Sequence, residues 1–222
     1  MKRYVSEFIA TFTLLLAILE AIVITAENSH GLLIVSAVAG ICVTILIYGF
    51  RKHSGAHMNP AISTAMWLDN QLTTRVYFGY FSAQLLGSAS AAFVIELAHG
   101  DGVYVMGMTV PSLVEWQAWI LEVILTFVLI LAIFRCTDSA RPKLDRFLAP
   151  VVGLIVFLEI YFAGPYSGAS MNPARSFGPA LVEGRSEFHY LYFSAPLFGA
   201  AVARYFDLIF RKKSKVANGA ND

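Results

Sequence analysis

The chain has 222 residues, of which 57% are hydrophobic and 14% are charged, and its formal net charge is +1. Soluble domains carry roughly a quarter of charged residues, so this composition excludes an ordinary soluble protein and indicates one that crosses a membrane several times. The net charge says nothing about nucleic acid, and no cluster of basic and aromatic residues suggests that the chain binds it.

Six apolar segments are long enough to cross about 30 Å of hydrocarbon as helices. They comprise residues 4–26, 32–50, 76–98, 116–135, 147–163 and 190–210. The first segment runs past the length of a signal peptide and lacks a clear cleavage site, so we expect it to remain as a membrane span. Two further apolar pieces, 59–68 and 172–182, are too short to span and suit re-entrant half-helices.

The lysines and arginines predict how these spans are oriented. When six spans alternate in direction, every lysine and arginine except Arg175, Arg185 and Arg204 falls on one side of the membrane. Because basic residues are enriched in cytoplasmic loops, we expect a multi-pass protein with both termini cytoplasmic. The plasma membrane is the expected location.

An internal repeat is the clearest feature of the chain. The octapeptide SGAHMNPA at residues 54–61 returns as SGASMNPA at residues 167–174, with only the fourth position changed. The repeat continues beyond it, because YFSAQLLG at residues 80–87 matches YFSAPLFG at residues 192–199. The chain therefore contains two copies of one unit.

We predict an all-α membrane protein with a single domain over residues 1–222. One copy covers about residues 4–98 and the other about residues 116–210, followed by a cytoplasmic tail at 211–222. Each copy contains three spans, an odd number, so the second copy must be inverted relative to the first. Inverted repeats place their functional site near the middle of the bilayer, where the two copies meet.

An Asn-Pro pair begins each of the two half-helices. Asn59 and Asn172 fit the N-cap position, and Pro60 and Pro173 fit the first helical position. A cap of this kind uses the side-chain oxygen and is expected to leave the amide NH2 free to donate. Two helix N-termini facing each other also create a positive region, which suits the oxygen of a neutral solute and repels cations.

The loops that precede these helices, residues 54–58 and 167–171, are expected to be extended in order to reach the middle of the membrane. Their small residues would then let backbone carbonyls line a narrow path as acceptors. Donors at the centre and acceptors along the path, against an apolar wall, are typical of a selective pore for small uncharged solutes.

These motifs resemble the aquaporin (major intrinsic protein) family over residues 7 to about 210. The resemblance rests on the two Asn-Pro-Ala triplets (Asn59, Pro60, Ala61 and Asn172, Pro173, Ala174), the run MNPARSFGPA at 171–180, and the Glu-x-x-x-Thr pairs that begin at Glu7 and Glu122. It implies a homotetrameric channel in the lipid bilayer, with one pore per chain, that passes water and small neutral solutes. No nucleophile-base or metal-ligand cluster appears near a common depth in the sequence, so we expect no enzyme activity, cofactor or metal.

The resemblance also assigns a selectivity filter. Arg175 follows the second triplet and takes the family's arginine position, while spacing assigns Ala39, Ile160 and Ala169 to the others. Strict water channels usually carry an aromatic residue and a histidine where this chain has Ala39 and Ile160, so the filter is expected to be wider and more apolar, which favours glycerol or urea. Ser176 instead follows the water-channel pattern. Water is the minimum expected permeant, and an aquaglyceroporin is the alternative.

Several ionisable residues lie in the predicted spans and loops. By the family pattern, Glu7 and Glu122 are expected to brace the two loops through hydrogen bonds to backbone N–H groups. Glu20 and Glu159 lie in spans with no motif to explain them. His57 offers a possible pH sensor, although loop bonding is the more common role of such a residue.

Two other classes of protein compete with a channel. Inverted repeats also occur in secondary transporters, which would use Glu7 and Glu122 as coupling carboxylates. A closed pore that mediates membrane adhesion is the second competitor.

Overall fold

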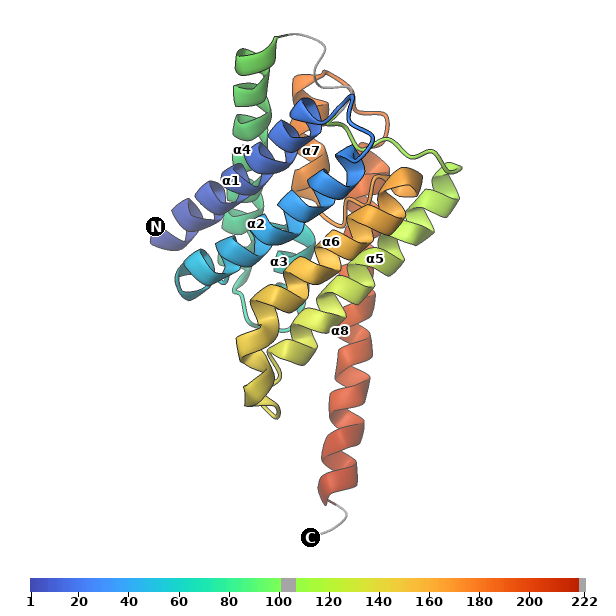
Figure 1. Ribbon diagram of the computed structural model, residues 1–222. Helices are drawn as coiled ribbons and strands as arrows, with labels where there is room; N and C mark the ends of the chain where they lie inside the picture. Colours follow the sequence, from blue (N-terminus) through green and yellow to red (C-terminus); the bar gives the residue numbers. More distant parts are fainter. Residues whose placement is uncertain (101–106, 220–222) are drawn as a thin grey trace.

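The computed structural model describes residues 1–100 and 107–219, with backbone alone for residues 211–219. Within these residues the secondary structure is helical (Figure 1). The long helices are α1 (Lys2–Ile24), α2 (Gly31–Ser54), α4 (Thr74–His99), α5 (Glu115–Cys136), α6 (Leu148–Ser167) and α8 (His189–Gly219). The short ones are α3 (Pro60–Leu68), α7 (Pro173–Val182) and a 3-10 helix, η2 (Pro142–Phe147).

The predicted fold class is confirmed. Six helices among the described residues are long and apolar enough to cross a membrane, and α3 and α7 coincide with the two predicted half-helices. Most helix ends agree with the predicted segments to within two residues, but the C-terminal ends of α2, α6 and α8 lie farther along the chain.

The last turns of α2 and α6 are compatible with these extensions. The last turn of α2 contains Arg51, Lys52 and His53, and basic side chains interact favourably with the C-terminal end of a helix dipole. In α6, Pro165 falls in the last turn, where its missing N–H costs one helix hydrogen bond without ending the helix. The backbone of α8 stays helical to Gly219, so the described part of the predicted tail is helical.

The helices pack as two similar groups that share a common contact. In the first half α1 packs against α2 and α4, and in the second half α5 packs against α6 and α8. The two groups join along α2 and α6, which lie side by side in Figure 1. The half-helix α3 packs against α4 and α8, and α7 packs mainly against α4, so each is enclosed by long helices.

Small residues make the helix contacts close in both halves. A Cβ atom added at Gly87 would lie 2.6 Å from the backbone oxygen of Phe8, and one at Gly199 would lie 2.7 Å from that of Val123. Membrane helices associate through close van der Waals packing, because lipid provides no hydrophobic drive between them. These two glycines therefore set how closely α4 approaches α1 and how closely α8 approaches α5.

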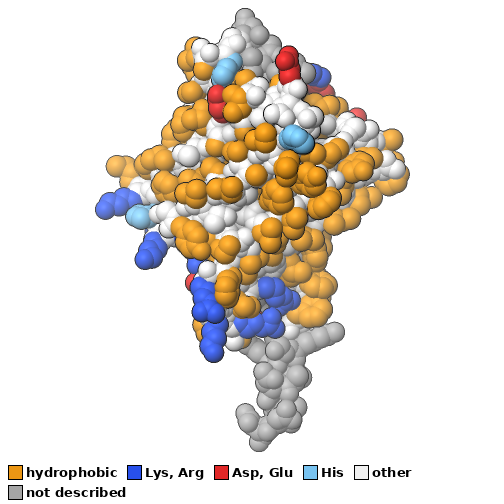
Figure 2. Space-filling model, viewed as in Figure 1, with side chains coloured by type: hydrophobic (Ala, Val, Ile, Leu, Met, Phe, Trp, Pro, Cys, Tyr) orange, Lys and Arg blue, Asp and Glu red, His pale blue; other side chains and the backbone are white. Residues whose placement is uncertain are grey.

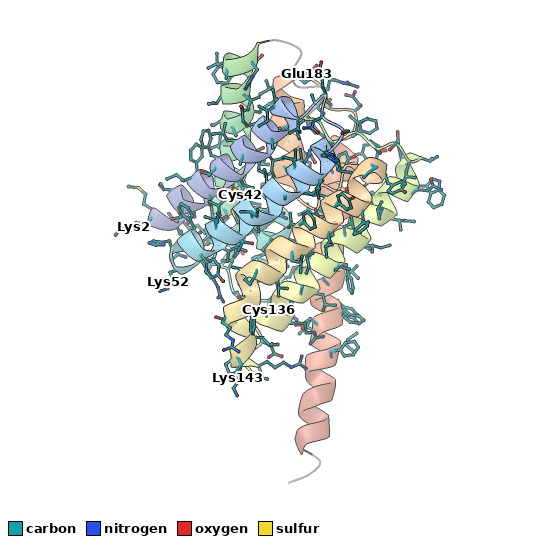
Figure 3. The ribbon with its side chains drawn as sticks, viewed as in Figure 1. Lys2, Cys42, Lys52, Cys136, Lys143 and Glu183 are labelled. Atoms are coloured by element: carbon teal, nitrogen blue, oxygen red, sulfur yellow. The ribbon has the colours of Figure 1, made fainter. Side chains whose placement is uncertain are left out.

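The surface has an apolar belt between two polar ends (Figure 2). Large apolar side chains within the spans are well exposed, among them Leu97, Phe162 and Tyr205. Figure 3 shows Lys2 and Lys52 at the left of the molecule, Lys143 at its lower left and Glu183 at the top. An exposed apolar belt of this extent fits an integral, multi-pass membrane protein.

Candidate functional site

The N-termini of α3 and α7 meet inside the protein through their capping asparagines. Asn59 Oδ1 accepts a hydrogen bond from the backbone N–H of Ala61 at 2.8 Å, and Asn172 Oδ1 accepts one from Ala174 at 2.9 Å. Both helices begin with a proline, which has no N–H to leave unpaired at this position. The Asn-Pro-Ala triplets thus form equivalent helix starts in the two halves.

Each asparagine also ties its own half to the other. Asn59 Nδ2 donates to the backbone oxygen of Met171 at 2.8 Å, and Asn172 Nδ2 donates to that of Met58 at 2.9 Å. The sequence predicted free NH2 groups, but one hydrogen of each amide is used in these bonds. Because an NH2 group carries two hydrogens, one per asparagine remains available to a solute.

The prediction that the preceding loops are extended is wrong. Both α2 and α6 continue to the serine that opens the octapeptide, so each loop has less distance to cover. The loops turn sharply through residues with positive φ, which is costly for residues other than glycine. These residues and their φ values are Gly55 (95°), Ala56 (53°), Met58 (52°), Gly168 (83°), Ala169 (42°) and Met171 (52°).

The carboxylate of Glu7 holds the first of these loops. It accepts hydrogen bonds from the backbone N–H groups of His57 at 3.0 Å and Met58 at 2.8 Å. The hydroxyl of Ser54 donates to it at 2.6 Å, and Gln84 Nε2 donates at 2.8 Å. Glu7 has no exposed surface, and this full set of donors compensates for its burial.

The carboxylate of Glu122 holds the second loop in the same way. It accepts from the backbone N–H groups of Ser170 at 2.9 Å and Met171 at 2.8 Å, and from the hydroxyl of Ser167 at 2.8 Å. The second half differs in one respect, because Pro196 stands at the repeat position of the glutamine that contacts Glu7.

Two tyrosines that the sequence analysis did not assign to the loops complete the loop contacts. The hydroxyl of Tyr80 donates to the backbone oxygen of Ser54 at 2.7 Å, and that of Tyr192 donates to Ser167 at 2.6 Å. Both tyrosines begin the repeated YFSA motif, so the repeat itself contained the signal. Matching polar residues at matching repeat positions would have identified them.

A cavity of about 340 Å³ is lined by both capping asparagines and by Arg175. Polar side chains line it at the end of α2 and beside η2, where Arg51 donates to Asp145 Oδ2 at 2.9 Å. Apolar side chains from α1, α2 and α6 form much of the remaining cavity wall: Leu14, Ile18, Val43, Ile47, Val152 and Val156. Few donors in an apolar wall favour a small, uncharged solute over an ion.

The predicted filter residues are only partly brought together. Ile160, Ala169 and Arg175 line this cavity, whereas Ala39 is fully buried and is not among its lining residues. Ala39 lies one helical turn before Val43, which does line the cavity, so it occupies the correct face of α2. The filter role of Ala39 therefore stays a prediction.

The guanidinium of Arg175 is bound to the segment that joins the two halves. Its Nη1 donates to the backbone oxygen of Gly107 at 3.1 Å and to the hydroxyl of Thr109 at 2.9 Å. Neither Gly107 nor Thr109 was predicted as part of the site. They lie between the repeats, where no motif or internal match marks them.

The remaining ionisable residues occupy distinct environments. His57 lines the cavity, and its Nδ1 is bonded to the hydroxyl of Ser63 at 3.0 Å. Glu20, unexplained by the sequence, pairs with His99 at 2.9 Å. Glu159 is buried, and neither of its oxygens has a hydrogen-bond partner among the described residues.

Comparison with known proteins agrees with this geometry. The family model described as Major intrinsic protein matches residues 1–206. The chain is 37% identical to aquaporin NIP3-1 of Arabidopsis thaliana over 90% of its own length, and it spans 64% of that relative. It is 30% identical to aquaporin TIP2-1 of the same plant, covering 91% of this chain and 84% of the relative.

A solved structure has the same architecture. The chain superposes on the aquaglyceroporin from Plasmodium falciparum with a TM-score of 0.81 and 26% identity, covering 92% of this chain and 94% of that one. The six apolar helices, the paired half-helices and the cavity between them define a membrane channel protein. The chain belongs to the major intrinsic protein family.

Proposed function

We propose that this protein is a passive channel that conducts water, passes small neutral solutes such as glycerol, and excludes ions and protons. The observation that supports it most directly is the pair of asparagine-capped helix N-termini beside a cavity that also contains Arg175. Membership of a family whose relatives are named aquaporins supports the same function.

The donors at the centre explain how the channel selects. A water molecule between Asn59 and Asn172 turns its oxygen toward the remaining amide hydrogens, so it accepts there and does not pass a proton along a chain of waters. The N-termini of α3 and α7 carry partial positive charge, and Arg175 adds a full charge, which together raise the barrier for cations.

We assign three groups of residues to this function. The pore midpoint consists of Asn59, Pro60, Ala61, Asn172, Pro173 and Ala174. The filter consists of Ile160, Ala169 and Arg175, with Ala39 as a predicted fourth member. Glu7 and Glu122 brace the loops, which is supported by the backbone hydrogen bonds that they accept.

Water is proposed as the principal solute and glycerol as the second. The apolar side chains of Ile160 and Ala169, in the cavity that Arg175 also lines, provide contact for an alkyl backbone, which supports glycerol passage. The secondary-transporter alternative is not favoured, because Glu7 and Glu122 are fully buried, occupied by donors, and not among the cavity-lining residues.

The orientation and assembly are proposed as well. We place both termini in the cytoplasm and the protein in the plasma membrane as a homotetramer of single-domain chains, each with two inverted repeats and a C-terminal tail. The basic residues near Lys2, Lys52 and Lys143 support this orientation (Figure 3). Four separate pores per assembly would follow.

A flux comparison tests the proposed function. The purified protein is reconstituted in lipid vesicles, and stopped-flow light scattering follows their shrinkage in sucrose and their swelling in glycerol. We expect water flux well above that of empty vesicles, together with slower glycerol flux and no dissipation of a proton gradient. Water permeability equal to that of empty vesicles would contradict the proposal.

A further inference from the structure

A row of hydroxyl groups connects Arg175 to the second half-helix. Thr109 Oγ1, which accepts from Arg175 Nη1 at 2.9 Å, donates to Ser176 Oγ at 2.6 Å. Ser176 Oγ lies 2.6 Å from Ser170 Oγ, and Ser170 Oγ donates to the backbone oxygen of Asn172 at 2.9 Å. Thr109, Ser170, Ser176 and Asn172 are all buried.

The direction of every hydrogen bond in this row is determined, because each hydroxyl has a single hydrogen. Ser170 uses its hydrogen on Asn172, so Ser176 must donate to Ser170. Ser176 can then only accept from Thr109, and Thr109 can only accept from Arg175. The hydroxyl chain, defined as Thr109, Ser176 and Ser170, therefore runs one way from the filter arginine to the capping asparagine.

The first half contains a serine at the equivalent position, and one of its two hydrogen-bond partners differs from those of Ser176. Ser63 stands at the repeat position of Ser176, and its hydroxyl is bonded to His57 Nδ1 at 3.0 Å and to Gln84 Nε2 at 2.9 Å. In the first half, this differing partner is Gln84, which belongs to α4 of the same half. In the second half, the corresponding partner of Ser176 is Thr109, which lies outside both repeats and also contacts Arg175.

The segment that contains Thr109 is itself fastened to the end of α6. The backbone N–H groups of Ser112 and Leu113 donate to the oxygen of Tyr166 at 3.0 and 3.2 Å. A Cβ atom at Gly168 would lie 2.4 Å from the methyl group of Thr109, so only glycine allows this approach. Thr109 is thus held in place independently of its bond to Arg175.

We propose that Thr109 is a positioning residue that fixes the guanidinium of Arg175 and thereby sets the solute selectivity of the pore. Both hydrogens of Arg175 Nη1 are used, one by Gly107 and one by Thr109. The other guanidinium N–H groups have no hydrogen-bond partner among the described residues and remain for a passing solute. The inference rests on the proposed channel function and assigns its selectivity partly to a residue between the repeats.

The test compares Thr109→Val with Thr109→Ser in reconstituted vesicles. Valine keeps the shape of threonine without the hydroxyl, and serine keeps the hydroxyl. Because hydrogen bonds to charged groups are among the stronger ones, we expect Thr109→Val to raise the ratio of glycerol to water permeability about threefold or more. Thr109→Ser should keep the wild-type ratio. This ratio does not depend on the number of active channels per vesicle, so mere misfolding does not imitate the effect.

Thr25→Val is the matched control. Thr25, the residue that follows α1, is also a buried threonine, but its hydroxyl bonds only to the oxygen of Ala21 in the last turn of α1, at 2.5 Å. This variant should keep the wild-type ratio. Ser176→Ala removes the next hydroxyl of the chain and should shift the ratio in the same direction as Thr109→Val, by a smaller factor.

The outcomes separate this inference from the proposed function. A wild-type ratio in Thr109→Val, with normal incorporation into vesicles, would overturn the positioning role. If Thr109→Val does not fold, Ser176→Ala provides the test. An unchanged ratio of glycerol to water permeability in Ser176→Ala would also overturn the positioning role of Thr109. Absence of water flux in the wild-type protein would contradict the channel function rather than the role of Thr109.

Discussion

Glu122 shows how single buried groups maintain an otherwise costly backbone. Met171 and Ala169 both have positive φ, a conformation that costs about 1–3 kcal/mol at a non-glycine residue. The carboxylate compensates by accepting from the N–H groups of Ser170 and Met171, which a loop without secondary structure would otherwise leave unpaired. The shape of the loop and the burial of the carboxylate therefore depend on each other.

Replacing this carboxylate tests that dependence. In Glu122→Gln one acceptor oxygen becomes an NH2 group that faces a backbone N–H, so we expect a loss of about 1–3 kcal/mol of stability. Thermal unfolding in detergent would measure it. The control is Glu20→Gln, where the side chain is 43% exposed and pairs only with His99. Equal melting temperatures for the two variants would show that the loop does not need the charge.

Ile160 permits a second test at the residue scale, because its side chain lines the same cavity as Arg175. A histidine at this position adds a polar ring and removes an apolar contact for an alkyl backbone. We expect Ile160→His to lower glycerol permeability about tenfold while water permeability stays within about twofold, since one lost hydrophobic contact and one new polar group suffice for such discrimination. Glycerol flux unchanged from wild type would remove Ile160 from the filter.

At the scale of elements, helix contacts depend on where glycine occurs. Gly87 in α4 touches the backbone of α1, and Gly199 in α8 touches that of α5 at the equivalent repeat position. Gly49 in α2, in contrast, has no atom within 4 Å of an added Cβ. The same residue type therefore has opposite consequences at different helix faces.

This contrast gives a matched pair of variants. Gly87→Ala should separate α1 from α4 and destabilise the protein by about 1–3 kcal/mol, as expected for overpacking. Gly49→Ala should be neutral or stabilise by up to about 1 kcal/mol, because alanine favours a helix more than glycine does. Thermal unfolding of both variants in one detergent checks the pair, and a similar effect of the two changes would contradict the packing argument.

Hydropathy and capping chemistry were sufficient to predict the elements. Apolar length identified the six spans, and the Asn-Pro pairs identified both half-helices to within one residue. The ends of α2 and α6 were less predictable, because Arg51 and Lys52 end the apolar run of α2 in the sequence and proline, as at position 165 of α6, often ends a helix. The left-handed loops that follow were not predicted, since they depend on glutamates more than 40 residues away in the chain.

At the scale of the whole molecule, ion pairs connect the two halves. Arg204 in α8 pairs with Asp69 at the end of α3, at 2.5 Å, and both side chains are about nine-tenths buried. Arg51 in α2 pairs with Asp145 in η2, but these side chains are 34% and 49% exposed. The first pair holds a half-helix in place from the opposite repeat, and the second pair lies in a more solvated region.

The two pairs should respond differently to the loss of one partner. Arg204→Met leaves Asp69 buried without its arginine, and breaking a buried pair in this way costs about 3–5 kcal/mol. Arg51→Met removes a partly exposed pair, for which less than about 1 kcal/mol is expected. Chemical unfolding of the two variants would compare them. A larger effect of Arg51→Met would show that burial does not determine the contribution of these pairs.

The sequence by itself determined the membrane class, the duplicated architecture and the residues that begin the half-helices. These features arise from local composition, helix capping and repetition, which act over a few neighbouring residues. Only the tertiary structure decided which donors remain free at Asn59 and Asn172, which residues line the cavity, and that Thr109 binds Arg175. Those outcomes depend on hydrogen bonds and packing between segments that are distant in the chain, and no local pattern specifies such pairings.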